Sequence, residues 1–296
     1  MEMKSKVGKY PFMAEPFHCD YAGRLFMSHL GNHLINAADF HSNDRGFGML
    51  YLNTIHKTWV LSRLAIELEE MPPAYTKFNV ETWVESAMRF FTNRNFRISL
   101  APDAQLKAEE PCAESKEPAA CVNSESPKVF GYGRSVWAMI DTETRQPADL
   151  LAINEGALTD YVAAGEEYIP ECPIAKPSRV KMTDQAELMR VVPVAYSDID
   201  MNGHVNSIKY IEHALDLWDM AWYQQHRLRR LDIAYVSESH LGDELCLYVE
   251  TVTEGREYAI RIAHRPIGPA PASEGEGNGG AEAEPVEACR CLIVFE

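Results

Sequence analysis

Five polar residues gather within nine positions of the chain, directly before a run of apolar residues with helical spacing. They are Asp198, Asp200, Asn202, His204 and Asn206. A carboxylate and an imidazole can together move a proton to and from a bound water, because an ordinary histidine titrates near neutral pH. An asparagine amide can donate a hydrogen bond to an oxygen that develops negative charge. The simpler interpretation is that Asp200 caps the helix that follows, a role that Asp often fills.

The same segment has a counterpart near the N-terminus. When the sequence from position 17 is set above the sequence from position 197, the D-x-x-G at Asp20 matches the D-x-x-G at Asp200. In each copy apolar residues then recur every three or four positions, which predicts a helix. These residues are Phe26, Leu30, His33, Ala37 and Phe40 in the first copy, and Ile208, Ile211, Leu215, Trp218 and Trp222 in the second. We expect the second helix to reach about Gln225, a length of about 30 Å.

Each predicted helix is followed by several segments with the alternating pattern of strands, as at Leu245, Leu247 and Val249. One long helix followed by antiparallel strands predicts an α+β unit in which a sheet curls around the helix. Six strands at a spacing of about 4.8 Å span about 29 Å, which matches the helix length. Such a unit is a hot-dog fold. The sequence therefore predicts a tandem, or double, hot-dog fold of two antiparallel sheets, with an N-terminal domain at 1–175 and a C-terminal domain at 176–296.

The two copies differ in the residues that could do chemistry. Where the second copy has Asn202 and His204, the first has Ala22 and Arg24. If these polar residues were needed for folding, both copies should carry them. We therefore expect a single site, built in the C-terminal domain.

The composition disfavours several classes of function. A formal net charge of −16 argues against a nucleic-acid partner, which requires a basic surface. Residues 103–127 and 271–288 are acidic and rich in Ala, Pro and Gly, which predicts solvated loops. No segment approaches the roughly 18 apolar residues of a membrane span, and the first residues show no secretory signal, so we expect a cytoplasmic protein. The seven scattered cysteines predict free thiols rather than disulfides or a metal site.

Three segments, in this order, carry a resemblance to a known family. They are WVLSRLAIELEEMPPAYTKFNVETWVE from Trp59, SVWAMIDTETRQPADL from Ser135, and SDIDMNGHVNSIKYIEH from Ser197. Together they resemble acyl-acyl carrier protein thioesterases of the FatA/FatB type and their bacterial relatives, and the resemblance covers most of the chain. It implies hydrolysis of acyl-carrier-protein thioesters to free fatty acids, which ends chain elongation in fatty acid biosynthesis. The acidic loops and the short N-terminus indicate a bacterial-type member.

The resemblance also implies the site. Carried over residue by residue, the catalytic residues fall on Asp200, Asn202, His204 and Glu238. His204 and Glu238 would activate a water, and Asp200 would orient this nucleophile. Asn202 would hold the water or donate to the carbonyl oxygen. The family has a cysteine beside the glutamate where this chain has Ser239, which argues against a covalent thiol mechanism. No metal or cofactor is implied. The implied partner is acyl carrier protein loaded with a fatty acyl chain, and a second copy of the chain, in a homodimer, is a further candidate.

Two other functions stay open at this point. One is hydrolysis of acyl-CoA or hydroxylated aroyl-CoA, or even dehydration of 3-hydroxyacyl thioesters, by another type of hot-dog enzyme. The other is acyl binding without catalysis. The N-terminal domain, which lacks the polar set, is expected to bind the acyl chain.

Overall fold

The computed structural model describes residues 4–102, 127–165, 168–178, 180–267 and 284–296. The two acidic stretches that were predicted as loops fall largely outside these residues. The last part of the second stretch was wrongly predicted, because strand β10 begins at Val286.

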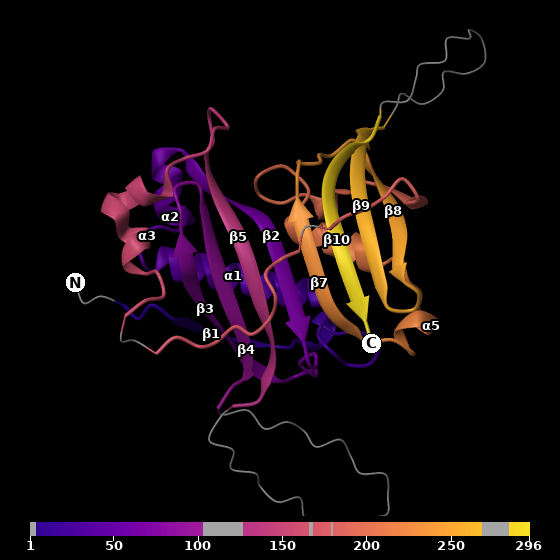
Figure 1. Cartoon of the computed structure of the whole chain (residues 1–296), viewed down its shortest axis with the longest axis horizontal. Coiled ribbons are helices and arrows are strands. Elements are labelled where there is room, and N and C mark those ends of the chain that lie inside the picture. The colour runs from indigo at the N-terminus through magenta and orange to yellow at the C-terminus, as the bar shows by residue number, and fades with distance from the viewer. Residues whose placement is uncertain (1–3, 103–126, 166–167, 179, 268–283) are drawn as a thin grey trace, which may run out of the picture.

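The described residues form one antiparallel sheet of ten strands in the order β1-β3-β4-β5-β2-β7-β10-β9-β8-β6. The N-terminal half contributes β1 (Gly8–Met13), β2 (Lys57–Leu68), β3 (Lys77–Ala87), β4 (Phe91–Leu100) and β5 (Val129–Asp141). The C-terminal half contributes β6 (Glu187–Pro193), β7 (Leu228–Tyr235), β8 (Asp243–Thr253), β9 (Glu257–Pro266) and β10 (Val286–Phe295). In Figure 1, α1 (Met27–Asn43) lies behind the strands of the N-terminal half, and the longer helix of the C-terminal half lies behind its own strands. Each half of the sheet therefore wraps around its own helix, whereas α2 (Met49–Leu52), α3 (Ala157–Asp160) and α5 (Met220–Tyr223) lie at the sides. The predicted α+β tandem hot-dog fold is confirmed, with five strands in each half instead of six.

The two halves meet through β2 and β7, which pair antiparallel from Arg63 opposite Ala234 to Glu67 opposite Arg230. The two predicted sheets are thus continuous. A strand edge left open would expose unpaired backbone N–H and C=O groups, and this pairing satisfies them for both halves.

The first predicted helix is confirmed as α1 (Met27–Asn43), whose Leu30, Leu34 and Ala37 are fully buried. It crosses α4 (Ser207–Leu215) closely. A Cβ built on Gly31 would lie 2.8 Å from Ile208 Cδ1, so any larger residue at this position would require the Ile208 side chain to shift.

The second helix was predicted too long. It ends at Leu215, and a separate short helix, α5 (Met220–Tyr223), follows. Asp219 caps α5 by accepting a hydrogen bond from Trp222 N, and the Leu215 carbonyl at the break accepts from the Tyr223 hydroxyl and from Trp218 N. The break turns Trp218 onto Phe295 at the end of β10, with ring centroids 4.9 Å apart. Trp218 therefore still packs against the core, although the helix has ended at Leu215.

Short helical segments complete the chain. They are α2 (Met49–Leu52), α3 (Ala157–Asp160) and the 3-10 segments η1 (Pro16–His18), η2 (Asn53–Ile55), η3 (Leu150–Gly156) and η4 (Tyr196–Asp198). Within the described residues, no helix combines the length and the apolar character that crossing a membrane requires.

Candidate active site

A tight turn between η4 and α4 carries the first three predicted site residues. Asp200 N donates to the His204 carbonyl at 3.0 Å, and Gly203 N donates to the Asp200 carbonyl at 3.0 Å. Gly203 has φ 85°, a left-handed backbone that favours glycine. The Asp200 carboxylate closes the turn by accepting from Asn202 N at 2.8 Å. The turn therefore fixes the backbone on both sides of the Asp200 side chain.

Asp200 does not cap α4. The N-cap is Asn206, whose side-chain oxygen accepts a hydrogen bond from Ile208 N at 2.9 Å. The capping interpretation of Asp200 is therefore wrong, and its carboxylate is free to face other side chains.

The imidazole of His204 lies between two carboxylates. Its Nδ1 is 3.7 Å from Asp200 Oδ1, and its Nε2 is 3.5 Å from Glu238 Oε1. The three side chains are 19–36% exposed, so a water or a substrate can reach them while solvent screening is reduced. Asn202 is exposed, and its Nδ2 lies 3.4 Å from Asp200 Oδ2. The structure thus brings all four predicted site residues together.

Glu238 comes from the loop after β7. The backbone fixes this loop against the turn, because Val205 N donates to the Ser239 carbonyl at 2.8 Å. Ser239, at the position of the family cysteine, is fully buried and accepts a hydrogen bond from the Tyr210 hydroxyl at 2.9 Å. It cannot face a substrate beside Glu238.

The N-terminal half repeats the turn without the chemistry. Asp20 Oδ1 accepts from Ala22 N and Arg24 N at 2.9 and 3.0 Å, and Asp20 N donates to the Arg24 carbonyl at 2.7 Å. Leu25 N donates to the Pro72 carbonyl, as Val205 N does to the Ser239 carbonyl. This match makes Met71 the counterpart of Glu238.

The N-terminal half therefore has Ala22, Arg24 and Met71 in place of Asn202, His204 and Glu238. Sequence comparison of the two copies found the first two differences, and the hydrogen-bond pattern adds the third. The turn is a shared scaffold, and only the C-terminal half carries the acid–base groups on it.

One residue at the site was missed by sequence reasoning. Arg145, in the turn after β5, reaches across from the N-terminal half and donates from Nη2 to Glu238 Oε1 at 2.6 Å. Arg145 lies inside the second family-like segment, directly after Thr144. Nothing in that local pattern indicates a partner 93 positions away.

A serine, a histidine and an aspartate also line up beside Glu238. Ser237 Oγ lies 3.3 Å from His264 Nε2, and His264 Nδ1 lies 3.1 Å from Asp243 Oδ2. The arrangement resembles a nucleophilic triad. The single Ser237 hydroxyl proton, however, points to the Glu287 carbonyl at 2.7 Å, because a carbonyl oxygen can only accept.

The hydroxyl proton is then not directed at His264 Nε2, which leaves the hydroxyl without the base that a nucleophile needs. Asp243 Oδ2 also accepts from His240 N at 2.8 Å. These contacts connect Ser237 to His240, which lie on either side of Glu238 in the sequence. They therefore hold in place the loop that carries the Glu238 carboxylate.

Neither thiol nor metal chemistry is indicated at the site. Cys289 and Cys291 are buried, and burial raises the pKa of the Cys289 thiol well above its usual value, which disfavours the reactive thiolate. Within the described residues, no group of three or more His, Cys, Asp and Glu side chains is placed to hold a metal ion.

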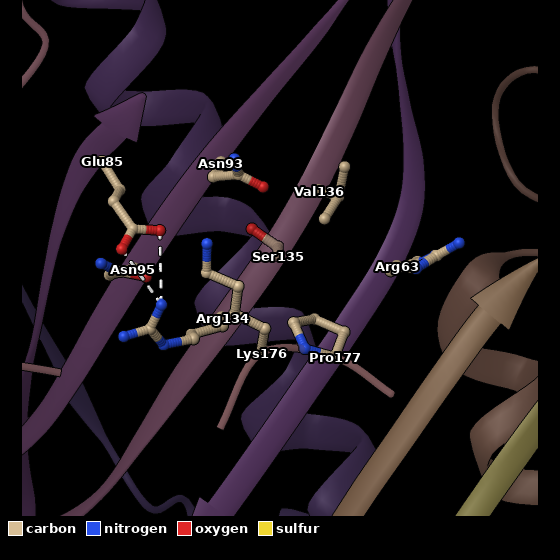
Figure 2. Close-up of a pocket in the computed structure, with 9 residues that line it drawn as sticks. All are labelled: Arg63, Glu85, Asn93, Asn95, Arg134, Ser135, Val136, Lys176 and Pro177. Carbon is tan, nitrogen blue, oxygen red and sulfur yellow. Dashed lines mark hydrogen bonds and ion pairs between the residues drawn. The ribbon is translucent and has the colours of Figure 1, made fainter. Parts of the chain in front are cut away.

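A cavity of about 180 Å³ lies elsewhere, on the face of the N-terminal half of the sheet that turns away from α1 (Figure 2). Arg134 and Glu85 form an ion pair at 3.1 Å along its edge, and Lys176 reaches over it from the segment between the halves. None of the four predicted site residues lines it.

Comparison with known proteins places these features in a family. Residues 9–108 match the model of the acyl-ACP thioesterase N-terminal domain, and residues 181–270 match that of the C-terminal domain. An acyl-ACP thioesterase from Bacteroides thetaiotaomicron has a similar crystal structure, with a TM-score of 0.77 and 43% identity over 100% of both chains. The 12:0-ACP thioesterase from Umbellularia californica shares the fold, with a TM-score of 0.72 and 16% identity over 100% of this chain and 99% of that one.

Plant relatives match over most of this chain. Oleoyl-acyl carrier protein thioesterase 2 of Arabidopsis thaliana is 24% identical over 72% of this chain and 52% of its own length. Palmitoyl-acyl carrier protein thioesterase of Gossypium hirsutum is 24% identical over 79% of this chain and 52% of its own length. The chain spans about half the length of these plant relatives. The two family models together cover more than half of the chain, which therefore belongs to the acyl-ACP thioesterase family.

Proposed function

We propose that this protein hydrolyses the thioester of acyl-acyl carrier protein and releases a free fatty acid. The observation that carries the proposal is the position of His204 between Asp200 and Glu238, at 3.7 and 3.5 Å, within the turn that leads into α4. Membership of the acyl-ACP thioesterase family supports the choice of substrate.

In this proposal the four residues divide the work of hydrolysis. Glu238 and His204 activate a water, and His204 takes its proton as the water attacks the thioester carbonyl carbon. Asn202, which is exposed at the tip of the turn, donates to the carbonyl oxygen as its charge develops. His204 then returns the proton to the leaving thiolate, while Asp200 keeps the imidazole oriented. A positioned acid or base contributes about 10² to 10⁴ in rate, and an oxyanion donor about 10² to 10³.

We assign separate roles to the two domains, 1–175 and 176–296. The C-terminal domain carries the acid–base groups. The N-terminal domain, which has Met71 and Ala22 at the matching positions, binds the acyl chain. A cytoplasmic location and self-association into a homodimer belong to the same proposal.

The test is product analysis with defined substrates. Purified protein is incubated with acyl carrier protein and with coenzyme A that bear the same series of acyl chains, and products are identified by mass spectrometry. We expect free fatty acid, formed faster from the carrier-protein thioester, and a loss of about 10² or more in kcat for His204→Ala. An enoyl product would indicate dehydration instead. Release of no fatty acid from any carrier-protein substrate would end the proposal.

A further inference from the structure

The turn that carries Arg145 is built to hold one conformation. It follows β5, and the Asp141 carboxylate accepts hydrogen bonds from Glu143 N and Thr144 N at 3.1 and 2.8 Å. Arg145 N donates to the Asp141 carbonyl at 2.9 Å. Arg145 itself has φ 60°, a left-handed backbone that is uncommon for a residue with a side chain. The turn therefore presents the arginine from a fixed backbone.

The guanidinium meets the oxygen that faces the imidazole. Arg145 Nη2 is 2.6 Å from Glu238 Oε1, and the same oxygen is 3.5 Å from His204 Nε2. From this geometry we infer that Arg145 is a positioning residue for the proposed hydrolysis, because it holds the Glu238 carboxylate toward His204. The inference rests on the proposed function and extends it, because no comparison and no sequence pattern assigns a role to Arg145.

Folding stability does not account for this contact. Arg145 is 54% exposed and Glu238 is 36% exposed, and ion pairs at such exposure contribute little to the free energy of folding. The contact can, however, fix the orientation of the Glu238 carboxylate. Within the described part of the chain, Arg145 makes the one hydrogen bond that the Glu238 carboxylate accepts. A glutamate side chain without that bond would rotate freely on its loop.

The chemistry of arginine suits this task. A guanidinium keeps its proton at any physiological pH, so it does not compete with His204 for the proton taken from water. It donates one charge-assisted hydrogen bond, from Nη2 to Glu238 Oε1, and such bonds are shorter and stronger than neutral ones. Holding the charged groups in place before the substrate arrives removes a reorganisation step from the reaction. The N-terminal half thus completes a site whose acid–base groups all belong to the C-terminal half.

The experiment compares two substitutions at the site with one control. Arg145→Gln removes the positive charge, and Arg145→Lys keeps the charge but replaces the planar guanidinium by an ammonium group. The matched control is Arg89→Gln, since Arg89 pairs with Asp149 at 3.1 Å in the same half, is 69% exposed and contacts none of the four proposed site residues. Steady-state kinetics on an acyl-carrier-protein substrate, thermal unfolding, and crystal structures of wild type and Arg145→Gln are measured.

We expect Arg145→Gln to lower kcat by about tenfold to a hundredfold, with KM within about twofold of wild type. Arg145→Lys should recover part of that loss, and Arg89→Gln should match wild type. All variants should unfold near the wild-type temperature. In a Glu238→Gln background, loss of Arg145 should change kcat by less than about twofold, because the group it positions is already disabled. The variant crystal structure should show the Glu238 carboxylate turned away from His204.

Three results would overturn the inference. They are an unchanged kcat for Arg145→Gln, a full additional loss in the Glu238→Gln background, and a Glu238 carboxylate that stays beside His204 without the arginine. If wild type releases no fatty acid, the proposed function fails, and the two crystal structures alone decide whether Arg145 positions Glu238. The two failures are therefore distinct.

Discussion

Replacing Asp200 by Asn separates its role in the turn from its role at the site. The amide of Asn keeps one oxygen that can accept from Asn202 N, so the turn should survive. The negative charge beside His204 is lost. Two unit charges at the observed 3.7 Å interact by about 4.5 kcal/mol at an effective dielectric constant of about 20, and by about 1.1 kcal/mol in bulk water.

Because the two side chains are 19% and 25% exposed, the lost interaction should lie between these limits, at about 2 to 3 kcal/mol. If it acts on the positively charged imidazole formed during reaction, kcat should fall by about 30- to 150-fold. Weakening one hydrogen bond from a charged to a neutral acceptor should lower the unfolding free energy by only about 1 kcal/mol.

The chain supplies a matched control for this prediction. Asp20 holds the matching turn in the N-terminal half, where its Oδ1 accepts from Ala22 N, as Asp200 Oδ1 does from Asn202 N, and also from Arg24 N, with Arg24 in place of the histidine. Asp20→Asn should therefore lower stability by at least as much in a urea titration and leave kcat unchanged. The reasoning is refuted if both variants lose activity equally, or if Asp200→Asn hydrolyses its substrate at the wild-type rate.

Three further predictions follow from the surroundings of the site and from the core. Ser237→Ala should keep kcat within about threefold of wild type, because the hydroxyl donates to a carbonyl, and a loss above about a hundredfold would identify Ser237 as a nucleophile. Alkylation of accessible thiols should leave most activity, since Ser239 stands at the family cysteine position, whereas full inactivation without unfolding would contradict this. Burial and the nearby cations of Arg94 and Arg45 lower the pKa of His41 to about 2. Its neutral form then stabilises the fold above the unfolded-state pKa of about 6.5, and lowering the pH from 6.5 to 5.5 should lower the unfolding free energy by about 1 kcal/mol through this residue. His41→Gln should flatten that slope in denaturant titrations at pH 5.5 and 6.5, and an unchanged slope would exclude this source.

Local pattern predicted part of the fold well and part of it badly. The period that includes Leu30 and Ala37 predicted α1, because a helix in contact with a sheet must bury one face, although Phe40 at the end of that period is exposed. The same period beyond Leu215 was misleading, since Trp218 reaches the core from a broken segment. Aromatic side chains are long enough to bury themselves from several backbone geometries. The pairing of β2 with β7 was not predicted, because nothing in either strand alone indicates which edge it will meet.

The site residues, too, could be predicted from local sequence only where they lie close together in the chain. Asp200, Asn202 and His204 lie within five positions, so one turn brings them together, and their types already indicated acid–base chemistry. Glu238 needed the family resemblance, since its loop lies more than 30 positions further along the chain and meets the turn only in the folded protein. Arg145 comes from the other half of the chain. A residue that acts across a boundary between repeats has no local signature.

Duplication of the hot-dog unit explains how one half can carry the acid–base groups while the other half supplies a contact that orients one of them. Both copies keep the Asp of the D-x-x-G turn, and in each its carboxylate accepts a hydrogen bond from the backbone N–H two positions further on, so this aspartate supports the turn in both halves. The groups on the turn and on the loop beside it differ at three positions, ending with Met71 in place of Glu238. The half that lacks the acid–base groups still contributes through Arg145, which touches the site from a turn the other half does not contain. A single C-terminal half would therefore hold the proposed acid–base groups without the contact that orients one of them.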